Sequence, residues 1–344
     1  MALAGLRGPA RWWLSAAAVV ALAGGPPGSA GPSPPPPPAV VHVGLSDGST
    51  AGRVPRLLGG QDIILQVAAA PRRPVLWQFG ALDTVLAQGA VIAGDDGAAR
   101  VRLTMPAVRV RTPCLVWVWS SGAEASHAAI VFPTTMLAEA AARLRGRRLA
   151  VLEDTGRVGR ALEAEGVAFT AVQSDIEKTF FEADLILVAC YEKGGPSARP
   201  WAVLEPRVRR GACLVVLNPP VGWAGWGLRR VELAEPAEGW VRLAPRFPVP
   251  LDPADLGVGP WAAALEAEAG AQSLVWLEPL PGGTGESAPA AAPLLAAGRL
   301  VGRGRVVVAL APGLERPDTD AIGRALLDGL ILWSLEPDED PSRT

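Results

Sequence analysis

The segment Ala183-Asp184-Leu185-Ile186-Leu187-Val188-Ala189-Cys190 decides the expected fold of the second half of this chain. From Leu185 onward it is uniformly apolar, without the alternation of a strand that has one face in water. Such strands are typical of parallel sheets whose two faces are both covered by helices. Residues 212–217 repeat the pattern, and a helix is expected between the two strands at residues 197–210. We therefore predict a βαβ unit here.

Alternating strands and helices extend from this unit in both directions. The elements expected upstream are helices at 135–144, 156–165 and 175–182 and strands at 147–153 and 167–172. The elements expected downstream are strands at 294–300 and 305–310, separated by Gly302-Arg303-Gly304, and an amphipathic helix at 318–333. Right-handed crossovers give the first four strands the order 2-1-3-4. We predict an α/β doubly wound, flavodoxin-like parallel sheet over residues 134–336, and a polar tail at 337–344.

Four stretches of this region resemble a known family. Residues 145–152, 183–188, 210–217 and 302–308 are similar to class I glutamine-amidotransferase-like domains. More narrowly, they look like the versions appended to exported bacterial glycoside hydrolases, where the last stretch reads Gly-basic-Gly-Arg-Val-Val before a terminal helix. Residues 247–256 resemble the loop that precedes the late strands of those domains. The resemblance implies an amidotransferase-like α/β domain.

The sequence lacks the catalytic signature of that family. Active members carry a cysteine in a Gly-x-Cys-x-Gly elbow, with a distant histidine as the base. The cysteine at the corresponding strand end is Cys190, which has Val188 and Glu192 at the elbow positions. The chain has two histidines, His42 and His127, and both precede the domain. Without an imidazole the usual base near neutral pH is missing, so we predict a degenerate, non-catalytic domain.

The N-terminus has the pattern of a secretory signal. Arg7 and Arg11 precede a short apolar run that ends in small residues, which is typical of a cleaved signal peptide. The alternative is an uncleaved membrane anchor, but a spanning helix needs about 20 apolar residues. We predict a signal peptide at 1–30 and a stiff proline-rich spacer at 31–38. The folded part is then expected in the periplasm or at the cell surface.

Residues 39–133 show short strands at regular spacing, without a helical period. The seven expected strands are 40–45, 62–68, 75–79, 84–88, 99–104, 114–119 and 127–132. This spacing predicts an immunoglobulin-like β-sandwich. Trp117 and Trp119 are two residues apart and share a face of their strand. We expect that face to be core; the alternative is an exposed face that stacks on sugar rings.

We predict neither a cofactor nor a metal site. His42 and His127 have no cysteine or carboxylate partners at ligand spacing, so they fall short of a usual zinc site. Cys114, Cys190 and Cys213 are expected to be reduced thiols. Cys190 and Cys213 would lie at opposite ends of neighbouring parallel strands, beyond the reach of a disulfide. A formal net charge of −2 without a basic stripe argues against nucleic acid as a partner.

The predicted ligand site follows from the expected sheet, since ligands bind beyond the carboxyl ends of its strands. Those ends carry Tyr191, Glu192 and Asn218, and Trp223 and Trp226 follow on a Gly/Pro-rich loop. The two indoles form either an aromatic platform for a ligand or a plug that packs over the sheet, and the plug is favoured. These five residues are the predicted binding set.

Carboxylates at the same edge offer an enzymatic alternative. Glu153 and Glu192 would be the pair of acids that glycoside hydrolysis needs. The competing interpretation is structural, because Asp154 or Thr155 precedes the helix at Gly156 and suits an N-cap. The structural interpretation is favoured.

These observations predict an exported, non-catalytic binding or assembly protein of the cell envelope, whose partner is a protein or a glycan. One alternative is a carboxylate-dependent hydrolase that acts on a glycan. Another is a structural subunit of an envelope complex. The sequence leaves the oligomeric state open.

Overall fold

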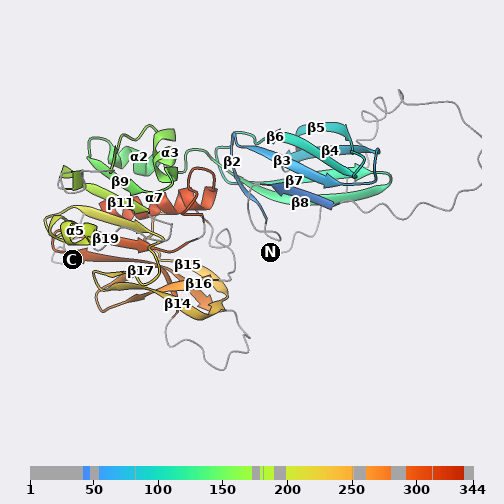
Figure 1. Cartoon of the computed structure of the whole chain (residues 1–344). Helices are drawn as coiled ribbons and strands as arrows, with labels where there is room; N and C mark the ends of the chain where they lie inside the picture. The colour runs from blue at the N-terminus through green and yellow to red at the C-terminus, as the bar shows by residue number, and fades with distance from the viewer. Residues whose placement is uncertain are drawn as a thin grey trace, which may run out of the picture. The chain divides into compact units, whose positions relative to one another are not determined.

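The described strands form three sheets (Figure 1). The computed structural model describes residues 42–46, 54–81, 83–172, 179–180, 182–189, 199–249, 251, 261–279, 292–311 and 313–336. The expected signal peptide, spacer and polar tail lie outside these residues, as do Cys190, Tyr191 and Glu192. The domain boundary expected at residue 133 stays a prediction.

The described residues between 42 and 132 form a β-sandwich of two sheets. One sheet has the order β1-β3-β6 and the other β2-β8-β7-β4-β5. Alternate residues of β3, Ile63, Leu65 and Val67, are buried in a core shared with the second sheet. A β-sandwich is thereby confirmed, with β2 as a strand that the sequence analysis missed. The strands are β1 (His42–Ser46), β2 (Arg56–Leu58), β3 (Asp62–Ala68), β4 (Pro74–Ala81), β5 (Thr84–Ile92), β6 (Ala98–Thr104), β7 (Thr112–Ser120) and β8 (Ala123–Phe132).

The paired indoles of β7 lie on the outer face of the five-stranded sheet. Val116 and Val118 point into the sandwich core, so Trp117 and Trp119 point the opposite way. Both indoles are half-buried. The expectation that they pack in the core is therefore wrong, although they do share one face.

A larger sheet of 11 strands follows, with β10-β9-β11-β12-β19-β18-β16-β14-β13 as its path, β17 on β18 and β15 on β17. Five of its strands run parallel to one another. Across the sheet, the first four of these lie in the order 2-1-3-4, numbered by their position along the chain. Residues of β11 alternate between two apolar clusters, so both faces of this part of the sheet are buried. The parallel strands are β10 (Thr170–Ala171), β9 (Leu149–Glu153), β11 (Leu185–Ala189), β12 (Cys213–Leu217) and β19 (Gly304–Ala309).

The remaining strands are antiparallel, and they overturn the predicted fold class. The described residues between 224 and 279 return as antiparallel strands, and none of them is helical. The region is mostly β with a mixed sheet. The predicted doubly wound, flavodoxin-like α/β domain and the resemblance to class I glutamine-amidotransferase-like domains are therefore wrong. These strands are β13 (Ala224–Gly225), β14 (Leu228–Ala237), β15 (Gly239–Leu243), β16 (Trp261–Ala267), β17 (Gln272–Pro279) and β18 (Leu294–Val301). Four helices have defined bounds: α2 (Ala138–Leu144), α3 (Arg157–Ala164), α5 (Arg199–Arg209) and α7 (Ala321–Leu335).

Helix α7 forms the centre of the apolar cluster on one face of this sheet. It packs on β12 and β19 and beside α2 (red in Figure 1). All 15 of its residues are buried, which is the behaviour of a helix that is covered around its whole circumference. The expected amphipathic helix is therefore wrong, because its two charged residues, Arg324 and Asp328, are only 6% and 2% exposed.

Backbone groups form hydrogen bonds with both of these buried side chains. The Arg324 guanidinium donates hydrogen bonds of 3.1–3.2 Å to three backbone carbonyl oxygens. The Asp328 carboxylate accepts a hydrogen bond of 2.9 Å from the backbone N–H of Ala140, in the first turn of α2. Leu137, at the N-cap of α2, supplies no capping side chain. Asp328 therefore replaces the side chain of an N-cap residue, because it accepts a hydrogen bond from a backbone N–H in the first turn of α2.

The turn between β18 and β19 lies against the end of α5. The backbone N–H of Arg303 donates a hydrogen bond of 3.0 Å to the carbonyl oxygen of Arg209. A Cβ atom at Gly302 would lie 2.5 Å from that same oxygen, and one at Gly304 would overlap two other carbonyl oxygens. This close packing of two backbone segments explains why positions 302 and 304 are glycine.

Candidate functional site

Glu153 stands at the carboxyl end of β9 and caps the next helix. Its two carboxylate oxygens accept hydrogen bonds from the backbone N–H groups of Val158 (2.8 Å) and Gly159 (2.7 Å), in the first turn of α3. A carboxylate at a helix N-terminus satisfies free N–H groups and interacts favourably with the helix dipole. Glu153 thus caps α3, whereas the sequence favoured Asp154 or Thr155 for this role. The carboxylate pair with Glu192 stays a prediction, since Glu192 lies outside the described residues.

Replacing Glu153 with alanine should lower the free energy of unfolding by about 1–2 kcal/mol, because two backbone donors of α3 lose their acceptor. Glu153→Gln keeps one side-chain oxygen and should lose less. Chemical denaturation of the three proteins measures both values. Equal losses for alanine and glutamine would contradict the capping role.

Asn218, directly after β12, ties two strand ends together. Its backbone lies in the left-handed region, with φ +43°, which asparagine tolerates better than most residues. Its side-chain oxygen accepts a hydrogen bond of 3.0 Å from the N–H of Ala311, and its amide donates to the carbonyl oxygen of Ala311 at 3.3 Å. A further contact of 3.4 Å reaches the Glu315 carboxylate. The amide of Asn218 is therefore used to join β12 to the loop after β19.

The two tryptophans of the following loop have different environments. Trp223 is 6% exposed and belongs to the apolar cluster that contains Leu204 and Val208 of α5. Trp226 is half-buried, and its ring centroid lies 6.3 Å from that of Trp223, at an interplanar angle of 39°. Trp223 is thus the plug that the sequence analysis favoured, whereas Trp226 keeps part of its ring at the surface.

Trp226 lines an open groove of about 500 Å³ between α5, the loop before β14 and strand β18. Cavities of about 300–1,000 Å³ accommodate small-molecule ligands. The lining is mainly polar, so the groove suits a hydrated ligand better than an apolar one. We call it the Trp226 groove; it is lined by Glu205, Arg209, Ala224, Gly225, Trp226, Arg299, Leu300, Val301 and Gly302.

Both guanidinium groups of the Trp226 groove have polar partners. Arg299 donates a hydrogen bond of 3.1 Å to the carbonyl oxygen of Trp226 and lies 3.6 Å from the Glu268 carboxylate. Arg209 and Glu205, one turn apart on α5, form an ion pair of 2.8 Å. The groove therefore offers a partly exposed indole, guanidinium N–H donors and a carboxylate acceptor. That combination matches the alternating apolar faces and hydroxyl groups of a sugar ring.

Three of the five predicted binding residues lie in the described part of the chain, and they have different surroundings. Asn218 lies at the strand ends outside the Trp226 groove, Trp223 is buried, and Trp226 lines the groove. The grouping with Tyr191 and Glu192 stays a prediction. No pattern in the sequence pointed to the other polar residues of the groove, Arg299, Arg209 and Glu205. Arg299 is 73 residues from Trp226 along the chain, so no local spacing could have connected them.

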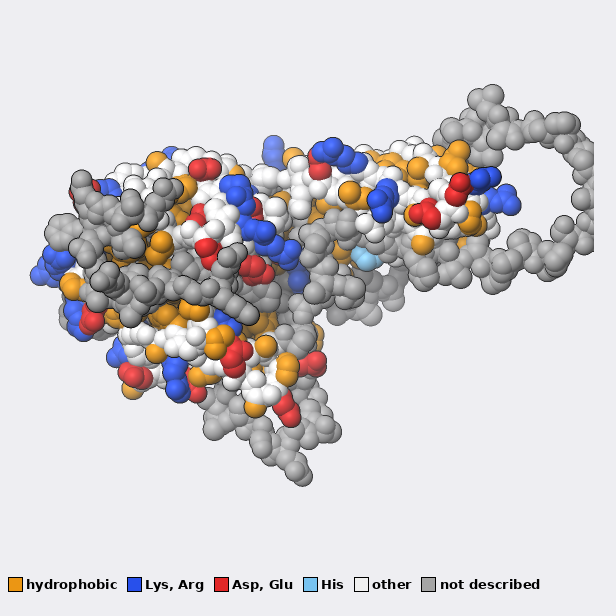
Figure 2. Space-filling model, viewed as in Figure 1, with side chains coloured by type: hydrophobic (Ala, Val, Ile, Leu, Met, Phe, Trp, Pro, Cys, Tyr) orange, Lys and Arg blue, Asp and Glu red, His pale blue; other side chains and the backbone are white. Residues whose placement is uncertain are grey.

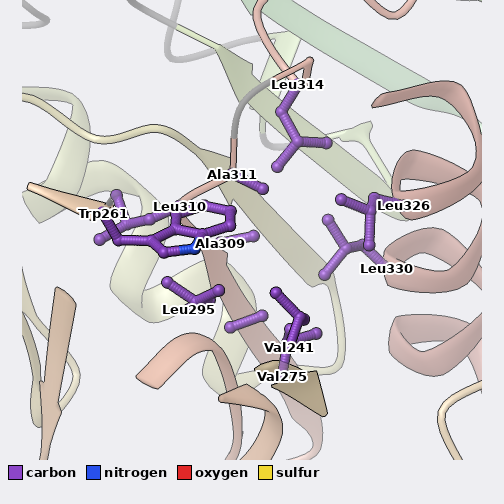
Figure 3. A pocket seen from close by; sticks show the side chains of 11 residues that line it. Val241, Trp261, Val275, Leu295, Ala309, Leu310, Ala311, Leu314, Leu326 and Leu330 are labelled. Atoms are coloured by element: carbon purple, nitrogen blue, oxygen red, sulfur yellow. The ribbon is translucent and has the colours of Figure 1, made fainter. Parts of the chain in front are cut away.

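A second, apolar cavity lies between α7 and the sheet (Figure 3). It offers about 10 Å³ to the centre of a water-sized sphere, which is room for about one water molecule. The sticks of Figure 3 show Trp261 on one side and Leu326 and Leu330 of α7 on the other. The Nε1 atom of Trp261 is buried without a hydrogen-bond partner among the described residues. This cavity is too small for a substrate.

The described thiols are poor nucleophiles. Cys114 and Cys213 are free, as expected. Burial raises the pKa of the Cys114 thiol to about 11 and also raises the pKa of Cys213, so both are protonated near neutral pH. Within the described ranges, no three His, Cys, Asp or Glu side chains gather as metal ligands. No helix in those ranges is long and apolar enough to cross a membrane.

Comparison with known proteins adds little. No known family and no curated protein matches the chain. The solved structure of the cytoplasmic protein STM3548 from Salmonella typhimurium is 10% identical, covers 54% of this chain and 98% of its own, and has a TM-score of 0.35. The exo-beta-1,4-mannosidase Op5Man5 from Opitutaceae bacterium strain TAV5 is 15% identical over 57% of this chain and 37% of its own, with a TM-score of 0.34. A beta-galactosidase from Bacillus circulans sp. alkalophilus is 11% identical over 55% of this chain and 30% of its own, with a TM-score of 0.32. Likenesses this weak carry no argument about fold or function.

Proposed function

We propose that this protein is an exported, non-catalytic component of the cell envelope that binds a glycan in the Trp226 groove. One observation carries the proposal: a partly exposed indole and two guanidinium groups line an open groove of about 500 Å³. A sugar ring can stack its C–H face on the indole, while the side chains at the rim bind its hydroxyl groups. The signal-like N-terminus supports export.

Three described side chains that could have served in catalysis are poorly suited to it. The Cys114 and Cys213 thiols are protonated, and Glu153 is engaged as the cap of α3. Stacking and hydrogen bonding need neither a nucleophile nor a base. A binding role is therefore the simplest chemistry that the Trp226 groove supports.

Replacing Trp226 with alanine should weaken glycan binding by about tenfold or more, since the stacking surface is lost. A glycan array screened with the purified protein identifies the ligand, and titration calorimetry measures its dissociation constant. Trp240→Ala is the matched control. Trp240 is 44% exposed on β15 and lies outside the groove, so this variant should bind as the unaltered protein does.

Two results would overturn the proposal. One is binding that Trp226→Ala leaves unchanged. The other is release of free sugar from the bound glycan, lost in Glu153→Gln or Glu192→Gln, because it would establish the carboxylate-dependent hydrolase instead.

A further inference from the structure

Among the described strands, β5 forms an unpaired edge of the sandwich. It stands at the end of the order β2-β8-β7-β4-β5, so only β4 pairs with it among the described strands. With nine residues it is the longest edge strand described, and its sequence TVLAQGAVI has no charge and no proline. Long, uncharged edges are unusual, because their free N–H and C=O groups pair readily with another strand.

Several other edges of the described sheets are protected. Edge strand β6 carries Arg100 and Arg102 toward solvent, and Arg102 forms an ion pair with Asp62 of β3. The edge strands β2, β10 and β13 are only two or three residues long. Short length and inserted charge are the usual ways to prevent edge-to-edge association. Strand β5 has neither.

Apolar side chains of β5 also remain at the surface. Leu86 is 41% and Ile92 is 71% exposed. Ala87 and Val91 point toward the sandwich core but are only half-buried against it, so the core is incompletely covered along this edge. Figure 2 shows hydrophobic side chains at the surface of the sandwich around β4 and β5. An added strand would bury this apolar surface.

The sequence of β5 indicates which strand that would be. Reading outward from Gln88, both directions give a small residue, an apolar residue, a valine and a β-branched residue. We propose that β5 pairs antiparallel with β5 of a second copy of this chain, about a two-fold axis at Gln88. Two identical strands paired this way bring like residues together, as a two-fold interface requires. The pairs are Gln88–Gln88, Ala87–Gly89, Leu86–Ala90, Val85–Val91 and Thr84–Ile92.

The existing ladder is compatible with this pairing. Gln78 of β4 lies opposite Gln88, so the new pair would place four glutamines in a row across four strands. A register shift opposite Phe79 leaves Leu86 outside the β4 ladder, while residues 87–92 pair regularly. The two five-stranded sheets would join into one continuous sheet.

The test introduces charge at the two-fold axis. Gln88→Lys and Gln88→Glu each place like charges opposite one another, which should weaken the dimer about tenfold or more. An equal mixture of the two variants pairs lysine with glutamate and should recover the dimer. Sedimentation velocity of the full chain over a range of concentrations measures each state. Because Gln88 is exposed, circular dichroism should show unchanged folding.

The control is Gln66→Lys, which changes an exposed glutamine on the inner strand β3 of the other sheet and should leave the dimer intact. An unaltered protein that stays monomeric to about 100 µM would overturn the proposal. A dimer that both Gln88 variants leave unchanged, or variants that fail to recover on mixing, would also overturn it. Gln88 is not part of the Trp226 groove, so glycan binding is an independent measurement.

Discussion

Gly304→Ala should lower the free energy of unfolding by more than about 4 kcal/mol, enough to prevent stable folding of many domains. A Cβ atom at this position would overlap the carbonyl oxygens of Val208 and Ala212. Both oxygens belong to the backbone at the end of α5 and the start of β12, so neither can rotate away as a side chain could. The hairpin β18–β19 would have to move off the helix, and β19 is the strand that joins the parallel and antiparallel parts of the sheet.

Denaturant unfolding followed by circular dichroism measures this loss. Gly270→Ala is the control, because Gly270 has φ +90° but no atom within 4 Å of the added Cβ. It should lose only about 1–2 kcal/mol, from the strained backbone conformation. If Gly304→Ala were no more destabilising than Gly270→Ala, the close approach of the hairpin to α5 would be contradicted.

The stability of the protein should fall as pH rises from about 4 to about 7, with Asp328 as a main cause. Burial raises the pKa of the Asp328 carboxyl from 3.8 to about 7, although the hydrogen bond from Ala140 opposes this shift. A group whose pKa is higher in the folded state stabilises the fold below its unfolded pKa. That contribution is lost as pH rises from about 4 through about 7. The two pKa values differ by about 3, which corresponds to about 4 kcal/mol.

Asp328→Asn should remove this dependence. The asparagine oxygen can still accept from the Ala140 N–H, and the side chain no longer has to carry a buried charge. We expect the variant to match the unaltered protein at pH 4 and to be more stable at pH 8 by up to about 4 kcal/mol. Burial also raises the pKa of Glu165 and Asp320, so the relevant quantity is the difference between the two proteins at each pH. A difference that is constant from pH 4 to pH 8 would contradict the assignment.

The sequence predicted the elements whose pattern is local. Strand β3 has the expected bounds, and the uniformly apolar β11 and β12 are parallel neighbours as expected. The antiparallel strands at 224–279 were not predicted, because the sequence there does not have the composition of strands. Strand β16 reads WAAALEA, a composition that favours helix. It is a strand because β14 and β18 pair with it on both sides, and such tertiary pairing overrides propensity.

The candidate site was predicted only in part, for a similar reason. Trp226 was recognisable as an aromatic residue on a Gly/Pro-rich loop. Its partner Arg299 comes from β18, and the missing side chain of Gly227 leaves the space that the guanidinium occupies. That partnership depends on how the mixed sheet brings β18 beside the loop. Without the correct sheet topology, Arg299 cannot be recognised as a neighbour of Trp226, even though Trp226 itself was predicted as a site residue.

The burial of α7 has a consequence for biosynthesis. Strands β9, β11 and β12 leave the ribosome well before residues 321–335, and until then one face of their sheet lacks its cover. At about 5–20 residues per second, the roughly 100 residues between β12 and α7 take several seconds to emerge. During that interval the nascent chain displays an apolar surface that chaperones recognise. If translation stopped before codon 321, the truncated protein would lack α7 and would be prone to aggregation and proteolysis.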